Sequence, residues 1–161
     1  MIRKTAFTLV FALAGTLGAA AQTDIHVPTP STWKADLAAS DFGGMPAPKS
    51  DMMHVTKDTD QMLSWTGTTV DDKGKVWHMG YTGPQDGTLR PVDKQGDKAS
   101  FKSDGSSHWV MADGSTMEST IAVSDDKSTA TITSDMTTKD GKKIHTKEVY
   151  NRVGAKKKAT T

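Results

Sequence analysis

The chain has 161 residues, with 20 Lys and Arg against 19 Asp and Glu, so its net charge is +1 with neutral His. This balance gives no electrostatic basis for binding nucleic acid or an anionic membrane surface. The absence of Cys from the sequence excludes disulfides and a lipid-modified cysteine, so stability has to come from a single apolar core.

Residues 1–21 have the pattern of a secretory signal peptide. Arg3 and Lys4 precede an apolar, uncharged stretch over 5–17, and small residues follow up to Ala21. A membrane anchor is the alternative, but the apolar stretch is shorter than the roughly 20 residues that span a bilayer. We therefore expect cleavage near Ala21 and a periplasmic or secreted protein without a stable membrane anchor.

The remaining chain is expected to form strands in close succession. Residues 22–31 read as an extended lead-in, 32–37 as a first strand and 42–48 as a loop rich in Gly and Pro. Turn signals then recur at short, regular intervals, as in all-β proteins. The further predicted strands are 50–57, 61–70, 75–82, 88–92, 98–102, 107–111, 115–124, 128–138 and 143–153.

The connections between these strands are too short for parallel crossovers, so consecutive strands should pair antiparallel. Asp-Gly at 104–105, 113–114 and 140–141 favours tight hairpins. Closing the sheet would remove its two edges. We predict an all-β domain over 32–153, a single up-and-down meander closing into a barrel of about 8–10 strands, with a sandwich as the alternative. Residues 154–161 are expected to be a disordered basic tail.

Side-chain alternation predicts which residues point into the barrel. Such residues leave either a packed core or a pocket for an apolar or aromatic molecule. The predicted inward and candidate ligand-binding residues are Trp65, Trp77, Met79, Tyr81, Trp109, Met111, Met117 and Ile132.

The last strand is ambiguous in this respect. Ile144 and Tyr150 share one face with Glu148, whereas Val149 and Val153 share the other. A switch of face at a β-bulge would reconcile the two patterns, so a bulge is expected there.

Several segments of the chain resemble a family of small exported bacterial proteins described as lipocalin-like. These are "STWKADLAASDFGGMPAPKS", "GPQDGTLRPV" and "SDDKSTATITSDMTTKDGKKIHTKEVYNRV". The corresponding motifs run over 33–50, 86–92, 124–129 and 140–152, nearly the whole mature chain. The resemblance implies a calycin-type barrel, and it implies no enzyme activity, cofactor or catalytic residue.

True lipocalins carry Gly-x-Trp on the first strand, with an Arg from the last strand over that Trp. Here Ser31-Thr32-Trp33 lacks the Gly, but Arg152 stands where such an Arg would be. The resemblance therefore implies that Arg152 covers Trp33 and closes one barrel end, a cation–π contact with a structural role.

The sequence contains no convincing catalytic motif. No Gly-x-Ser-x-Gly, His-Glu-x-x-His or phosphate-binding loop occurs. Copper binding is an alternative, because Met and His neighbour each other at 52–54 and 78–79, and Met111 follows His108. Adjacent strand residues point to opposite faces, however, and alternation directs His78 and His108 away from the apolar side chains.

We therefore expect a non-enzymatic binding protein without a cofactor, which carries or senses a small apolar or amphipathic ligand in its barrel. The alternatives are a structural or interaction protein with a filled core and, less favoured, a periplasmic copper-binding protein. A cavity of roughly 300 Å³ or more, lined by Trp65, Trp77 and Trp109, would favour the first. The sequence specifies neither the ligand nor the oligomeric state.

Overall fold

A computed structural model describes residues 24–155, which form ten antiparallel strands. The predicted signal peptide at 1–21 and the tail from 156 onward lie outside the described residues. No helix within the described range is long and apolar enough to cross a membrane. Each predicted strand is present, with its ends within two residues of the predicted ones: β1 Ser31–Ala35, β2 Ser50–Asp58, β3 Met62–Val70, β4 Val76–Pro84, β5 Arg90–Pro91, β6 Lys98–Phe101, β7 Ser106–Val110, β8 Thr116–Val123, β9 Thr129–Thr137 and β10 Lys143–Arg152.

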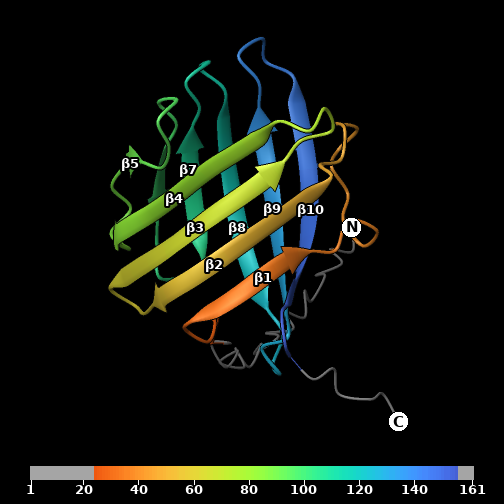
Figure 1. Ribbon diagram of the computed structural model, residues 1–161. Helices are drawn as coiled ribbons and strands as arrows, with labels where there is room; N and C mark the ends of the chain where they lie inside the picture. Colours follow the sequence, from red (N-terminus) through yellow and green to blue (C-terminus); the bar gives the residue numbers. More distant parts are fainter. Residues whose placement is uncertain (1–23, 156–161) are drawn as a thin grey trace, which may run out of the picture.

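The strands form one sheet in the order β4-β3-β2-β1-β10-β9-β8-β7-β6-β5. Every strand pairs antiparallel with its neighbour, and the first strand pairs with the last. In Figure 1, β1 to β4 cross in front of β7 to β10, so the sheet folds into two facing layers. The predicted meander is thus confirmed as a nearly closed barrel, which is compatible with a lipocalin-like fold.

The two edge strands, β4 and β5, meet at a seam. The Gly80 N–H donates to the Val92 carbonyl over 2.7 Å and joins β4 to the residue after β5. Arg90 donates from both terminal nitrogens to the Asp86 carboxylate, over 2.7 and 2.8 Å. Such a bidentate pair holds its two groups in one geometry. Asp86 lies in the connection between β4 and β5, so this pair holds the segment that leads into β5, and Arg90 also donates to the Tyr81 hydroxyl of β4 over 3.4 Å. The motif over 86–92 therefore has a structural role at the seam, where Val92 is buried.

The expected bulge in β10 is wrong. The register between β10 and β9 is continuous from Lys143 to Asn151, and the irregularity lies instead in β2, between Val55 and Lys57. No switch of face is needed in β10 because Glu148 has a hydrogen-bond partner inside the barrel, the Tyr150 hydroxyl.

Trp33 is the largest fully buried side chain of the core and has only 1% of its surface exposed. Its indole N–H donates to the Ser31 hydroxyl over 2.8 Å, so the buried polar group is satisfied. Trp33 and Arg152 are register partners between β1 and β10, at the same end of the barrel. The cation–π contact between them stays a prediction.

Residues 24–28 run across one end of the barrel, and we call them the strap. The strap contacts turns that lie far apart in the sequence. The Lys127 ammonium, between β8 and β9, lies 3.1 Å from the Asp24 carboxylate. Gly105, between β6 and β7, has φ of 81°, and a Cβ there would come within 2.8 Å of the Ile25 side chain. Glycine at 105 thus satisfies both the turn and the close approach of the strap.

His26 fastens the strap to the turn between β2 and β3. Its Nδ1 and Nε2 each lie 2.9 Å from a carboxylate oxygen, of Asp58 and Asp60 respectively. The Val27 N–H also donates to Asp58 over 2.8 Å. Burial opposes protonation of the ring, but the hydrogen bonds to the two carboxylates outweigh it and raise the pKa of His26. The imidazolium can donate to both carboxylates at once, whereas the neutral ring cannot.

Replacing Trp33 by Ala should lower the free energy of unfolding by about 3–5 kcal/mol, since it removes the largest fully buried side chain of the core. Urea denaturation followed by far-UV circular dichroism measures the loss. The control is Leu89→Ala at a residue 42% exposed, where a change within about 0.5 kcal/mol is expected. Equal effects of the two substitutions would contradict this assignment of the core.

The contacts of His26 with Asp58 and Asp60, here called the His26 clamp, should hold the strap more firmly when the imidazole is protonated. Because the folded state raises the pKa of His26, its contribution is complete below the ordinary value of 6.5 and is lost as the pH rises through the folded value. The Val27 amide should therefore lose protection from hydrogen exchange over that range, after correction for the intrinsic rate. His26→Ala should lose it at every pH, whereas His145→Ala, at a side chain 62% exposed, should not. A pH-independent protection factor would refute the clamp.

Candidate ligand-binding cavity

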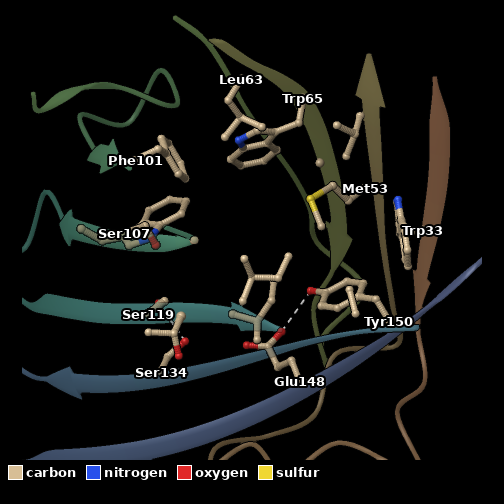
Figure 2. A pocket seen from close by; sticks show the side chains of 18 of the residues that line it. Trp33, Met53, Leu63, Trp65, Phe101, Ser107, Ser119, Ser134, Glu148 and Tyr150 are labelled. Atoms are coloured by element: carbon tan, nitrogen blue, oxygen red, sulfur yellow. Dashed lines mark hydrogen bonds between the residues drawn. The ribbon is translucent and has the colours of Figure 1, made fainter. Parts of the chain in front are cut away.

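A cavity of about 350 Å³ lies inside the barrel. Figure 2 shows side chains from both layers of the sheet pointing into it. This volume is within the range of small-molecule sites, and it exceeds the voids of an ordinary close-packed core. Its apolar lining consists of Ile25 and Val27 of the strap together with Trp33, Met53, Val55, Leu63, Trp65, Met79, Phe101, Trp109, Met111, Met117, Ile121, Ala130 and Ile132.

Six of the eight predicted ligand-binding residues line the cavity: Trp65, Met79, Trp109, Met111, Met117 and Ile132. The other two, Tyr81 and Trp77, are not among its lining residues. Tyr81 is buried against Phe101, with ring centroids 4.6 Å apart. The Trp77 indole donates to Asp71 over 3.1 Å, and Lys75 lies over its ring, so Trp77 is held at the turn between β3 and β4.

Three aromatic side chains form one wall of the cavity. Trp65 and Trp109 each meet the Phe101 ring edge-to-face, with centroids 6.2 and 5.7 Å apart and interplanar angles of 82°. Trp65 and Trp109 themselves lie 6.3 Å apart. Such arrangements are favourable for aromatic rings. Because the three rings come from β3, β6 and β7, this aromatic wall links the two layers near the seam.

A row of hydroxyl groups crosses the interior, starting beside the aromatic wall. Ser107, Ser119 and Ser134 are consecutive register partners on β7, β8 and β9. The Ser119 and Ser134 hydroxyls lie 2.9 Å apart, and Ser107 accepts a hydrogen bond from the Trp109 indole over 3.0 Å. Sequence reasoning did not single out this row, although the alternation that places Trp109 and Met117 inside also places these serines there.

The polar end of the cavity holds an acid–tyrosine cluster, formed by Asp51 of β2 with Glu148 and Tyr150 of β10. The Tyr150 oxygen lies 2.9 Å from Asp51 Oδ2 and 3.1 Å from Glu148 Oε2. Figure 2 shows the contact between Tyr150 and Glu148 beside Met53 and Trp33. One hydroxyl proton cannot satisfy two carboxylates. Both contacts are therefore hydrogen bonds only when one of the two carboxyl groups is protonated.

Burial controls the ionisation of the acid–tyrosine cluster. It raises the pKa of Asp51 and Glu148, and hydrogen bonds from Tyr150 offset only part of the effect. The charge of Asp51 adds to the rise at Glu148. Burial, and then the two neighbouring carboxylates, raise the pKa of Tyr150, so the phenol stays neutral. Perturbed carboxyl groups in a cavity are a recognised mark of functional sites.

No histidine of the described chain is among the residues that line the cavity. Four lie beside polar side chains of neighbouring strands: His54 with Thr32, His78 with Thr68, His108 with Glu118 and His145 with Asp135. Met52 is exposed whereas Met53 lines the cavity, so these adjacent thioethers point to opposite faces. Within residues 24–155, no group of three or more His, Asp or Glu side chains is placed to hold a metal ion.

Comparison with protein-family models gives no match for the chain. Comparison with curated proteins gives no significant match either. The candidate site therefore rests on the geometry of the barrel interior.

Replacing Glu148 by Gln should flatten the dependence of stability on pH. Because burial raises the pKa of Glu148, the folded protein keeps a proton that the unfolded chain releases above its ordinary value of 4.5. The free energy of unfolding should therefore fall as the pH rises from 4.5 towards the higher pKa that Glu148 has in the folded state. The amide cannot ionise, so the variant should gain stability relative to the wild type between pH 4.5 and 8.

Urea denaturation at several pH values measures this difference. Glu118→Gln is the matched control, because Glu118 is 70% exposed and pairs with His108 outside the cavity. Parallel pH profiles for the wild type and Glu148→Gln would show that Glu148 ionises freely in the folded state.

Proposed function

We propose that this protein is an exported, non-enzymatic binding protein that carries or senses a small apolar or amphipathic molecule inside its barrel. We further propose that it belongs to the exported lipocalin-like proteins whose motifs it resembles. The observation that carries the proposal is the cavity of about 350 Å³ with its aromatic wall of Trp65, Phe101 and Trp109. A protein that acts only through its surface has no need of such an interior.

The interior chemistry supports binding in preference to catalysis. The hydroxyls of Ser119 and Ser134 hydrogen-bond to each other and lack the neighbouring imidazole that would activate a nucleophile. His26 of the strap is engaged by Asp58 and Asp60. Apolar walls with a few polar groups at one end are instead typical of sites that hold and orient a small molecule.

The test uses adjacent methionines that point to opposite faces. Met53→Trp adds bulk inside the cavity and should weaken binding of the neutral fluorescent probe N-phenyl-1-naphthylamine by roughly tenfold or more, since the extra ring takes space the probe needs. Met52→Trp, at a residue 43% exposed, adds the same bulk outside and should leave binding unchanged. Probe fluorescence, titrated against protein, gives the dissociation constants.

Circular dichroism and urea denaturation of the same variants show whether each has folded. If the wild type does not bind the probe, or if Met52→Trp and Met53→Trp weaken binding equally, the interior is not the binding site. Ile132→Phe, on the facing layer, provides a second change within the cavity should Met53→Trp fail to fold.

A further inference from the structure

We infer that the ligand of this cavity is an aromatic or otherwise apolar amine, with its ring against the aromatic wall and its nitrogen at the acid–tyrosine cluster, and that apolar carboxylates are rejected. This inference rests on the proposed function and adds the chemical class of the ligand.

The first argument is the hydrogen bonding of the acid–tyrosine cluster. Asp51, Glu148 and Tyr150 together offer carboxylate and phenol oxygens but only one phenolic proton. Their mutual contacts engage Asp51 Oδ2 and Glu148 Oε2. Asp51 also accepts from the Thr69 hydroxyl and the Met52 amide, but for Glu148 the donor is the Tyr150 hydroxyl, which Asp51 shares. An ammonium group brings three further donors. Its N–H groups can reach both carboxylates, which removes the competition for the Tyr150 proton and strengthens each contact through charge.

The second argument is charge. Among the described residues, neither Asp51 nor Glu148 forms an ion pair with Lys, Arg or His. The other charged side chains that line the cavity are Asp58, Asp97 and Lys102, so carboxylates outnumber cations in its described lining. Asp51 and Glu148 are half-buried, so an unbalanced negative charge there is unfavourable, and a cationic ligand would balance it. A ligand carboxylate would instead add like charge where water screens it poorly.

The third argument is that the aromatic wall and the acid–tyrosine cluster lie at different ends of the cavity. Figure 2 shows Trp65 and Phe101 on one side of the space and Glu148 with Tyr150 on another. An aromatic ring can therefore contact apolar side chains while a short arm carries its nitrogen to the carboxylates. Trp33 and Met53 lie beside the acid–tyrosine cluster and cover the junction between ring and arm.

The experiment compares three compounds that share one ring: 2-(1-naphthyl)ethylamine, 1-ethylnaphthalene and 1-naphthylacetate. Isothermal titration calorimetry at pH 7.5, supported by quenching of tryptophan fluorescence, gives their affinities for the full protein. The amine should bind roughly tenfold or more tightly than the neutral compound, because it alone gains charge-assisted hydrogen bonds. The carboxylate should bind roughly tenfold or more weakly than the neutral compound.

Variants then assign the preference to the acid–tyrosine cluster. Glu148→Gln and, separately, Asp51→Asn should reduce the ratio of the affinity for the amine to the affinity for 1-ethylnaphthalene by roughly tenfold, because each removes a carboxylate that the ammonium group would contact. Glu118→Gln removes an exposed carboxylate and should keep the full preference. Circular dichroism checks the fold of each variant, and the two cluster variants are independent of each other.

The outcomes separate the two proposals. If none of the three compounds binds, and N-phenyl-1-naphthylamine does not bind either, the binding function itself is refuted. If 1-ethylnaphthalene binds but the amine binds no more tightly, the function stands and the amine specificity is wrong. A preference for the amine that survives both Glu148→Gln and Asp51→Asn would also overturn the assignment, because the cation would then be recognised elsewhere.

Discussion

The pairing of the first strand with the last is the constraint on which the rest of this structure depends. Trp33 and Arg152 are opposite one another across β1 and β10, so the ladder runs unbroken through all ten strands. This pairing joins the two halves of the chain into one sheet that can curl until β4 meets β5, and it places β2 and β10 on either side of β1. Asp51 and Tyr150 can meet only in that arrangement. The cavity and its polar end are thus consequences of how the sheet closes.

Much of the fold was predictable because turns and alternation are local signals. Asp-Gly at 113–114 marks a hairpin wherever it lies in space, and the spacing of Trp109 and Met111 identifies one inner face. The polar interior was harder to predict, because the apolar pattern by which inner faces are recognised treats Glu148 as an outward residue. Whether a buried acid is tolerated depends on its partners, and Asp51 lies far away in the sequence.

The candidate site combines an apolar aromatic surface with two acidic side chains, and neither feature favours the stability of an empty barrel. Ring faces at Trp65 and Phe101 offer an apolar surface, whereas Asp51 and Glu148 are half-buried, with pKa values raised by desolvation. In a protein stabilised by one core without disulfides, retaining two such acids reduces stability. A role in recognition gives a reason to keep them, since binding sites often sacrifice stability for function. The strap completes the enclosure by covering one end of the barrel.

The seam between β4 and β5 has a consequence for the motions of the molecule. Elsewhere in the described sheet, neighbouring strands share ladders of hydrogen bonds, but here the Gly80–Val92 bond and the contact from Arg90 to the Tyr81 hydroxyl join the two edges. Separating a few bonds costs less than separating a ladder, so thermal breathing of the wall should begin along this line. Since Phe101 and Trp65 lie just inside it, brief parting of the seam would open a lateral passage into the cavity while the strap stays in place.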